Sequence, residues 1–332
     1  MTKKLRVGLV SYAHVHAPGL ANTLGGLEQV EFAGIYDEDE QRGRAAASTH
    51  EAKWHPTLEG LLKASEAIVV ASTNVDHRRY TEAAAKARVH VLCEKPLATT
   101  IEDAKAMIDA CRSAGVQLGN ALPVRGSPAV MALKDTIASG ALGRIRAVRA
   151  TNPGQYPGSW FGDKRLAGGG AAMDHTVHAA DAIRWLLNDE FTRVQAELGS
   201  FIYDLAVEDC GVLTCDLAGG AFASIDCSWS RPQTFPTWGG VTLHVVGEKA
   251  TVDIDVFRQA LTHYDDTAGR TRLLGWGDDL TARMVADFVD AILAGRPVPI
   301  SGEDGLRALE VALAAYRSSE SGRPVAITDL RA

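Results

Sequence analysis

The sequence predicts an α/β protein: an N-terminal doubly wound parallel sheet followed by a C-terminal α+β domain with a mostly antiparallel open sheet. Over about the first 120 residues, short and almost continuously apolar runs alternate with helical patterns, as expected of parallel strands buried on both faces. After Pro123, longer runs of alternating polarity follow one another, with glycine turns such as Gly219-Gly220. The length of 332 residues allows two domains, which we expect at residues 1–122 and 123–332.

The first domain should contain five strands separated by helices. The expected strands are Leu5–Val10, Val30–Tyr36, Glu66–Ser72, Val89–Cys93 and Val116–Ala121. The expected helices are Pro18–Leu27, Glu38–Ser48, His77–Ala87 and Ile101–Ala114. Strands that alternate with helices of this length indicate βαβ units and a nucleotide-binding Rossmann domain.

The second domain should begin with a helix near Ser127–Ser139 and a strand at Arg144–Thr151, followed by a Gly/Pro-rich loop. A helix that holds Asp174 and His178 comes next. The later strands are expected at Phe191–Tyr203, Asp209–Leu217, Ala221–Ser230, Val241–Val246 and Ala250–Val256. Two closing helices (Asp278–Ala294 and Glu303–Ser321) and a short strand (Pro324–Ile327) complete the domain, and the last helix is a candidate to pack back on the first domain.

The composition is that of a soluble globular protein, with 46% hydrophobic and 23% charged residues. The net charge of −7 and the absence of a Lys/Arg run argue against nucleic acid as a partner. Neither a signal peptide nor an apolar run of membrane-spanning length is present. Five cysteines without a CxxC spacing are typical of buried thiols in a reducing compartment: Cys93, Cys111, Cys210, Cys215 and Cys227. We therefore expect a cytoplasmic protein with no membrane partner.

The loop after the first strand departs from the usual dinucleotide-binding motif. Such a loop normally reads G-x-G-x-x-G, so that backbone amides can approach a pyrophosphate. Here it reads Ser11-Tyr12-Ala13-His14-Val15-His16, without those glycines. Serine and alanine are small enough for close approach, but His16 is bulky where the helix should pack tightly. The helix that begins near Pro18 still offers N-terminal amides to an anion, and we expect residues 11–15 to contact the cofactor.

Asp37 ends the second expected strand and has two possible roles. Its carboxylate could bind an adenosine ribose and repel a 2′-phosphate, which favours NAD over NADP. It could equally cap the helix that begins at Glu38.

His14-x-His16 raises the question of a metal site. Two loop histidines are weak support without a third ligand, so the sequence predicts no metal. We expect these histidines to lie near the cofactor phosphates or the substrate.

Three further residues have side chains suited to proton transfer. Lys95 follows the apolar run Val89–Cys93, and Asp174 and His178 follow the triple glycine Gly168-Gly169-Gly170. Residues four apart share one face of a helix, so Asp174 and His178 can face the same cleft. A lysine, a carboxylate and an imidazole together can handle the proton of an alcohol or carbonyl.

These motifs, in their order along nearly the whole chain, resemble the glucose–fructose oxidoreductase/inositol dehydrogenase (Gfo/Idh/MocA) family of NAD(P)-dependent enzymes. The matching stretches are Ala71–His77, His90–Ala98 with its Glu94-Lys95-Pro96 motif, Arg125, Leu142–Ile145, Gly168–Asp181, Glu208-Asp209, Gly247, Glu303–Gly305 and Gly322–Val325. Glu94-Lys95-Pro96 alone is a weak signal. Followed by three glycines and the Asp174-x-x-x-His178-x-x-Asp181 helix, it is specific. Thr73 stands where the family usually has proline, and the first loop lacks the family's glycines.

The resemblance implies roles for individual residues. His178 would be the general acid/base, Lys95 would bind a substrate hydroxyl and the nicotinamide ribose, and Asp174 would orient the substrate. Glu94 would stabilise its turn or contact the cofactor. Further cofactor contacts would come from Ser72, Thr73, Asn74, His77 and Arg125. Further substrate contacts would come from His16, Tyr156, Trp160, Phe161, Arg165 and His175.

The function implied is a dehydrogenase that transfers a hydride between NAD, less favourably NADP, and a secondary alcohol or ketone of a sugar or cyclitol. Two alternatives remain open. Similar proteins use bound NAD to cleave glycosides through transient oxidation and elimination, and the same scaffold could serve as a non-enzymatic sensor of nucleotides or sugars. The resemblance also implies a homodimer or homotetramer formed through the sheet of the second domain.

Overall fold

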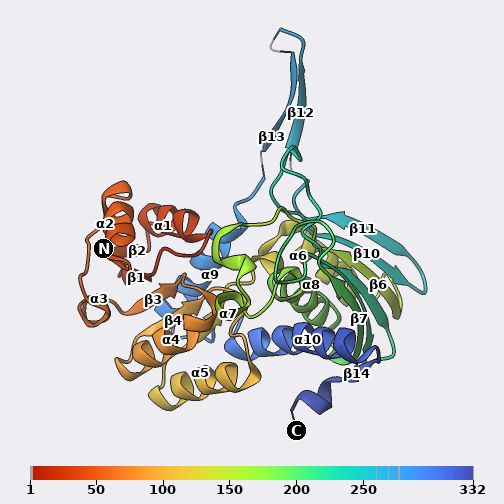
Figure 1. The fold of residues 1–332 in the computed structure, drawn as a ribbon, viewed down its shortest axis with the longest axis horizontal. Coiled ribbons are helices and arrows are strands. Elements are labelled where there is room, and N and C mark those ends of the chain that lie inside the picture. Colours follow the sequence, from red (N-terminus) through yellow and green to blue (C-terminus); the bar gives the residue numbers. More distant parts are fainter. Residues whose placement is uncertain (1–2, 259, 268, 276, 332) are drawn as a thin grey trace. The chain divides into compact units, whose positions relative to one another are not determined.

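The computed structural model describes residues 3–258, 260–267, 269–275 and 277–331, which form two compact units (Figure 1). The first unit comprises the chain up to Leu122 with the segments Arg165–Gly168 and Thr281–Leu309. The second comprises Pro123–Lys164, Gly169–Leu280 and the chain from Glu310 onward. A domain boundary between residues 122 and 123 stays a prediction.

The first unit is built on a five-stranded parallel sheet in the order β2-β1-β3-β4-β5. The strands are β1 (Leu5–Val10), β2 (Val30–Tyr36), β3 (Ala67–Val70), β4 (His90–Cys93) and β5 (Leu118–Asn120). All four residues of β3 and all three of β5 are buried, as their apolar sequence predicts. The sequence therefore predicted all five strands correctly, with the last three extended too far.

Helices cover both faces of this sheet. They are α1 (Ala17–Gly26), α2 (Glu40–Thr49), α3 (Leu58–Ala64), α4 (His77–Lys86), α5 (Ile101–Ala114) and α9 (Leu280–Leu293), with the short 3₁₀ turn η1 (Asn74–Asp76). Asp39, Thr57 and Thr100 cap α2, α3 and α5 by accepting backbone N–H groups. The sequence analysis missed α3, a helix of seven residues with a glycine in its first turn.

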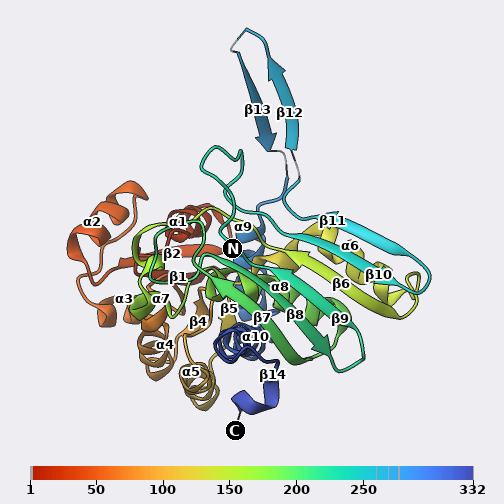
Figure 2. The same cartoon turned by 45° about the vertical axis from the view of Figure 1, so that its right-hand side comes forward.

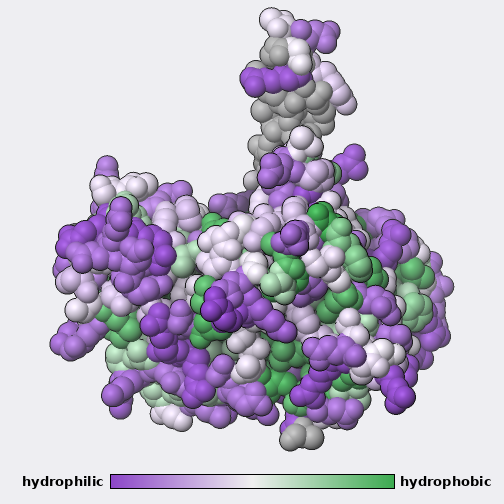
Figure 3. Space-filling model, in the orientation of Figure 1, coloured by the Kyte–Doolittle hydropathy of each residue, from purple (hydrophilic) through white to green (hydrophobic). Residues whose placement is uncertain are grey.

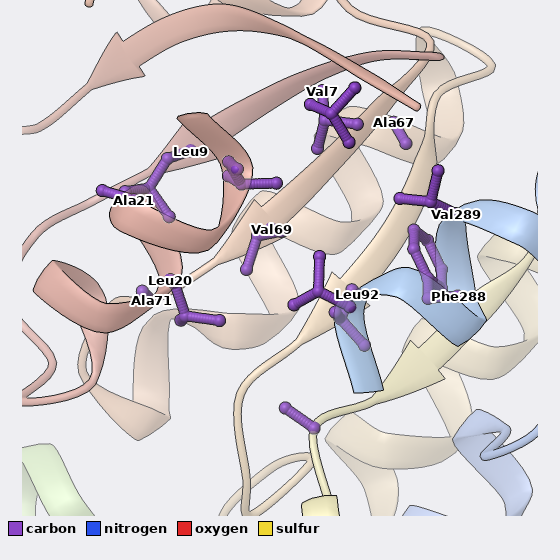
Figure 4. Close-up of a cluster of buried hydrophobic side chains, with 14 of the residues drawn as sticks. Val7, Leu9, Leu20, Ala21, Ala67, Val69, Ala71, Leu92, Phe288 and Val289 are labelled. Atoms are coloured by element: carbon purple, nitrogen blue, oxygen red, sulfur yellow. The ribbon is translucent and has the colours of Figure 1, made fainter. Parts of the chain in front are cut away.

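One face of the sheet carries a hydrophobic core that joins distant parts of the chain. Val7, Leu9, Val69 and Leu92 project from the strands, as the labelled side chains in Figure 4 show. They meet Leu20 and Ala21 of α1, and Phe288 and Val289 of α9. On the opposite face α3 packs closely, because a Cβ on Gly8 would lie 2.7 Å from Leu61. Helices on both faces explain why these strands are apolar throughout.

The second unit contains a seven-stranded sheet in the order β11-β10-β6-β9-β8-β7-β14 (Figure 2). Its strands are β6 (Ile145–Thr151), β7 (Phe191–Gly199), β8 (Cys210–Leu217), β9 (Phe222–Asp226), β10 (Thr242–Gly247), β11 (Thr251–Asp255) and β14 (Val325–Ala326). Neighbouring strands are antiparallel except β6 and β9, which are parallel. The predicted α/β fold with a mostly antiparallel second sheet is therefore confirmed.

Helix α8 (Ala171–Leu187) packs against β6, β8 and β9 of this sheet. The remaining helices are α6 (Pro128–Ala138), α7 (Lys164–Ala167) and α10 (Gly302–Ser321), with 3₁₀ turns η2 (Pro123–Gly126), η3 (Ser159–Gly162) and η4 (Ile327–Leu330). Fourteen of the 17 residues of α8 are buried, so it is a core helix rather than a surface amphipathic helix.

Strands β7 and β9 each end four residues earlier than the sequence suggests, and in each case an aspartate turns the chain. The amides of Phe201, Ile202 and Tyr203 donate to Asp209 at 2.9, 3.0 and 2.6 Å, so β7 ends at Gly199 and not at Tyr203. Asp226 accepts the amide of Ser228 at 3.0 Å, which ends β9.

The hairpin of β12 (Ala260–Asp265) and β13 (Arg270–Gly275) was missed by the sequence analysis. The expected closing helix at Asp278–Ala294 begins two residues later, at Leu280. Gly269, with a φ of +61°, comes directly before β13, and a glycine between two short runs is typical of a hairpin turn. Gly269 was therefore the feature of the sequence from which the hairpin could have been predicted.

No helix among the described residues is both long and apolar enough to cross a membrane. On the face drawn in Figure 3, hydrophilic residues predominate and hydrophobic residues are scattered among them. Four cysteines are buried as predicted, but Cys210 is only partly buried because it lies at the first position of β8.

Candidate active site

The predicted cofactor residues of the first unit lie where its parallel strands end. Ser11 follows β1, Asp37 follows β2, Ser72 follows β3 and Glu94 follows β4. The strand order reverses between β1 and β3, and in open α/β sheets ligands bind at the carboxyl edge beside such a reversal. The fold therefore gathers residues that are up to 83 positions apart at one edge of one sheet.

The β1–α1 loop has the backbone of a tight turn although it lacks the expected glycines. Ser11 has a φ of +66°, the left-handed region that normally favours glycine. Its amide donates to the Tyr36 carbonyl at 2.7 Å, and its hydroxyl donates to Glu38 and accepts the amide of Ala13, both at 3.3 Å. Ser11 and His14 are fully buried, whereas Val15 is exposed. The side chain of Ser11 thus stabilises the turn from within.

Asp37 does not cap α2, since Asp39 does. Instead, Asp37 accepts the amide of Tyr12 at 2.6 Å and that of Asp39 at 2.8 Å. Arg42 donates to both of its carboxylate oxygens, at 2.8 and 2.6 Å. The helix-cap interpretation is wrong for this residue, and its charge is paired with a guanidinium.

The turn after β3 is tied together by its own polar side chains. Thr73 donates to Asp76 at 2.7 Å, and the side-chain Nδ2 of Asn74 donates to the Ala167 carbonyl at 2.8 Å. His77 Nδ1 donates to the Pro96 carbonyl at 2.9 Å. Burial lowers the pKa of His77, so its ring is held neutral. These residues therefore fix the position of the turn that follows Lys95.

Glu94 and Lys95 are both buried at the end of β4. The Glu94 amide donates to the Val70 carbonyl at 3.0 Å, and its carboxylate accepts the Lys95 amide at 3.1 Å. Burial would raise the pKa of Glu94, but His14, His16 and Lys95 together hold that pKa well below its usual range. Glu94 is therefore an ionised carboxylate, and the Lys95–Pro96 peptide bond that follows is cis.

The two loop histidines lie beside Glu94. His16 Nδ1 is 3.1 Å from Glu94 Oε1, and the rings of His14 and His16 are 4.6 Å apart at 60°. One ligand atom from each of the three residues lies within 4.8 Å of the others. The expectation of no metal rested on the lack of a third ligand, and Glu94 now provides a candidate.

In the second unit, Asp174 and His178 lie one turn apart on the buried helix α8. The indole Nε1 of Trp229 donates to Asp174 Oδ2 at 3.0 Å, and His175 Nε2 lies 3.2 Å from the same oxygen. A Cβ on Gly154 would lie 2.6 Å from the His175 ring, so any larger residue at position 154 would displace that ring. Asp174 is thus held in position by two aromatic side chains.

The start of α8 is held by two residues that the sequence analysis did not single out for this role. Glu208 Oε1 accepts the amides of Gly170 and Ala172, each at 2.9 Å, and the hydroxyl of Tyr316 at 2.6 Å. The Tyr316 oxygen in turn accepts the amides of Gly170 and Met173 at 3.2 and 3.1 Å. A carboxylate at a helix N-terminus is stabilised by the helix dipole, so this network fixes the helix that carries Asp174.

Other predicted site residues have structural contacts. Arg125 is paired with Asp181 through both carboxylate oxygens, with Nε at 2.8 Å from Oδ2. Tyr156 packs against Trp229 with ring centroids 5.1 Å apart. Trp160 stacks on Phe161 at 4.0 Å, and both are buried.

The structure brings the predicted residues together in two groups. One group belongs to the first unit and includes Ser11, His14, His16, Glu94 and Lys95. The other belongs to the second unit and includes Asp174, His175, His178 and Tyr156; Trp229, which was not predicted, contacts Asp174 and Tyr156. Arg165 is part of the first unit, whereas Trp160 and Phe161 are part of the second. The convergence of Lys95 with Asp174 and His178 stays a prediction.

Comparison with known proteins gives consistent matches. A family model described as an oxidoreductase family with an NAD-binding Rossmann fold matches residues 5–122, and a GFO/IDH/MocA C-terminal domain matches residues 130–253. The 1,5-anhydro-D-fructose reductase of Ensifer adhaerens is 30% identical over 307 residues, covering 90% of this chain and 88% of that protein. The myo-inositol 2-dehydrogenase of Thermotoga maritima is 28% identical over 276 residues, covering 80% of each chain. Among solved structures, GenD2 from gentamicin A biosynthesis, in complex with NAD, matches with a TM-score of 0.89 and 27% identity, covering 98% of this chain and 97% of that one.

Proposed function

Because the chain belongs to the GFO/IDH/MocA family and is an NAD-dependent oxidoreductase, we propose that it transfers a hydride between nicotinamide and a secondary alcohol or ketone of a sugar or cyclitol. The observation that carries the proposal is the burial of three ionisable side chains, with Lys95 2%, Asp174 4% and His178 9% exposed. Folding rarely buries such groups unless they are paired or functional. The names of the two relatives above both specify polyhydroxylated substrates.

The first unit fits a dinucleotide at the carboxyl edge of its sheet. Ser11 provides the left-handed backbone of a phosphate loop, and α1, which begins at Ala17, has no side-chain cap at its N-cap residue His16. Ser72, Thr73, Asn74, His77 and Glu94 line the neighbouring strand ends, and we assign them with residues 11–15 to cofactor binding. Bound nicotinamide would supply the hydride acceptor or donor.

The proton is handled by the protein's own side chains. In the oxidising direction, the imidazole of His178 takes the proton of the substrate hydroxyl, and Lys95 donates a hydrogen bond to the same oxygen. Asp174 accepts a hydrogen bond from a neighbouring hydroxyl, and Trp229 and His175 keep its carboxylate in place. We assign His16, His175, Tyr156, Trp160 and Arg165 to the substrate side, and Arg125 to the cofactor side.

The preferred cofactor is NAD, because Asp37 and Glu38 lie at the end of β2 where an adenosine ribose would bind. Arg42 bears on this choice because it donates to Asp37 and lies 2.9 Å from Glu38. A guanidinium there can also accommodate a 2′-phosphate. Fluorescence titration with NAD and NADP should give the lower dissociation constant for NAD. An Asp37→Ser substitution should bring the dissociation constants of the two cofactors closer together. An equal or tighter constant for NADP in the unsubstituted protein would contradict the assignment.

The proposed reaction is tested by following absorbance at the reduced-nicotinamide band across a panel of sugars and inositols with NAD. We expect Lys95→Ala and His178→Ala each to lower kcat by about 10²–10⁴. His244→Ala is the matched control, because its partly exposed ring on β10 pairs only with Asp253 among the described contacts.

Near-normal turnover in both Lys95→Ala and His178→Ala would exclude this mechanism. Nicotinamide retained through purification, with no net NADH formed, would instead favour glycoside cleavage. Failure to bind either dinucleotide would favour a sensor.

A further inference from the structure

Two histidines and a carboxylate gather at the carboxyl edge of the first sheet, outside the Lys95–Asp174–His178 set. One ligand atom from each of His14, His16 and Glu94 lies within 4.8 Å of the other two. We propose that this His14–His16–Glu94 cluster binds one divalent transition-metal ion. His14 and Glu94 are also assigned above to the cofactor, and His16 to the substrate, so the ion would share their site. The inference concerns metal binding by the protein itself, is tested without a dinucleotide, and holds whether or not the proposed hydride transfer is correct.

The backbone of the cluster is fixed by β3. The His14 amide donates to the Ala71 carbonyl and the Glu94 amide to the Val70 carbonyl, each at 3.0 Å. Asn120 Nδ2 donates to the Glu94 carbonyl at 3.1 Å. His14 and Glu94 are 80 residues apart in the sequence. Their backbone amides are therefore bonded to consecutive carbonyls at the end of β3. Such rigid support is what a preformed metal site requires.

The three side chains converge. Glu94 Oε1 lies 3.1 Å from His16 Nδ1, while Oε2 accepts the Lys95 amide at 3.1 Å. The latter bond orients the carboxylate, as outer hydrogen bonds commonly do for metal ligands. The His14 and His16 rings lie 4.6 Å apart. All three ligands therefore share one small volume.

One of the three ligand–ligand distances is close to that expected around a coordinated ion. Nitrogen and oxygen ligands about 2.0–2.2 Å from a tetrahedral zinc lie roughly 3.4 Å from one another. His16 Nδ1 and Glu94 Oε1, 3.1 Å apart, are already close to that spacing. Ligation through these two atoms replaces their direct contact.

The donor set selects the class of ion. Two imidazoles with one carboxylate suit Zn²⁺, Fe²⁺, Co²⁺ or Ni²⁺, whereas Mg²⁺ and Ca²⁺ prefer oxygen ligands alone. Three protein ligands leave at least one coordination position for water or for an oxygen of a small molecule. We therefore expect an exchangeable ion rather than a closed structural site.

The test is equilibrium dialysis of the chelator-treated full chain against Co²⁺ or Zn²⁺, without any dinucleotide. Metal content is measured by mass spectrometry, and Co²⁺ coordination by its visible d–d absorption. We expect one ion per chain, and a loss of affinity of at least about tenfold in His16→Ala and Glu94→Gln. His14→Ala should behave alike, with folding checked by circular dichroism.

His244→Ala is the matched control, because His244 and Asp253 form a histidine–carboxylate pair at 2.6 Å on strands β10 and β11 of the other unit. It should bind Co²⁺ as the unsubstituted chain does. His16→Ala keeps the experiment decisive if the buried His14→Ala variant does not fold, since His16 is partly exposed. A wild-type chain without stoichiometric metal, or unchanged affinity in both His16→Ala and Glu94→Gln, would overturn the inference.

Discussion

Trp229 and Asp174 form a buried hydrogen bond on which the proposed mechanism depends indirectly. The indole is fully buried and donates to Asp174 Oδ2 at 3.0 Å. Replacing the indole N–H removes a charge-assisted bond worth roughly 1.5–3 kcal/mol. Asp174 would then turn more freely, and its hold on the substrate would weaken.

We therefore predict that Trp229→Phe raises KM more than it lowers kcat, with a loss in kcat/KM of about 10- to 100-fold. Trp54→Phe is the control, because the buried Trp54 Nε1 has no hydrogen-bond partner among the described residues. Steady-state kinetics on both variants measure the difference. Equal kcat/KM values in the two variants would show that the Trp229 hydrogen bond does not position Asp174.

His77 links stability to pH. Burial lowers its pKa in the folded protein, so the unfolded chain binds a proton more readily below about pH 6.5. The stability that neutral His77 provides is present above that pH and is lost as the pH falls toward the folded-state pKa.

Urea denaturation at pH 7.5 and 5.5 should show a fall in the free energy of unfolding of up to about 1.4 kcal/mol per pH unit from this group. The fall should be smaller in His77→Gln. It should be unchanged in His263→Gln, because His263 is exposed. An identical pH dependence in all three proteins would exclude His77 as the source.

At the scale of the element, the first turn of helix α8 is held in position by a hydrogen-bond network. Tyr316 OH donates to Glu208 and accepts the amides of Gly170 and Met173. Burial and the neighbouring Glu208 carboxylate raise the pKa of Tyr316, which keeps its hydroxyl protonated and able to donate. The hydroxyl therefore satisfies three buried polar groups at once.

Tyr316→Phe leaves those groups with fewer partners and should lower the free energy of unfolding by about 1–3 kcal/mol. Tyr264→Phe is the control, since Tyr264 is 76% exposed and should change stability by less than about 0.5 kcal/mol. Chemical denaturation of both variants gives the comparison. A Tyr316→Phe protein as stable as the control would show that the network contributes little.

Helices and strands whose bounds are set by neighbouring residues in the sequence could be predicted from it. The bounds of β1 and α5 match those expected, because β1 is apolar except at Arg6, and α5 has a Thr100 cap at its start and Gly115, with a φ of +69°, at its end. Helix α3 was missed because seven residues are too few to show the 3.6-residue periodicity of an amphipathic helix.

The supports of the site were harder to predict because they come from distant positions. Trp229 lies 55 residues from Asp174, and Tyr316 lies 146 residues from Gly170. No local pattern marks such pairs, since only the folded sheet brings them together. By contrast, Lys95 and Asp174 could be proposed from the sequence because each lies in a motif with its own local sequence.

At the scale of the whole molecule, the open face of the second sheet is a proposed subunit interface. Val212 and Phe222 project from β8 and β9 and are 50% and 60% exposed. Their pairing register, Val212 with Asp226 and Phe222 with Asp216, places them on the same face. Helix α8 packs on strands of this sheet, and exposed apolar side chains away from it suit a second copy.

A Val212→Glu/Phe222→Glu double variant should therefore lower the molar mass measured by light scattering from that of a dimer or tetramer to that of a monomer. Val75→Glu is the control, because Val75 is 37% exposed in the other unit. A wild-type chain that is already monomeric, or a double variant that stays oligomeric, would contradict this interface.

The left-handed backbone at Ser11 has a consequence for redesign. The chain lacks the glycines of a phosphate loop, yet at this position it has the main-chain conformation that a glycine would adopt. A Ser11→Gly substitution therefore keeps a φ that glycine adopts readily and removes only the hydroxyl that bonds Glu38 and the amide of Ala13. Starting from that substitution, glycines could be introduced into the loop one residue at a time, and the contribution of each replaced side chain to cofactor affinity could be measured.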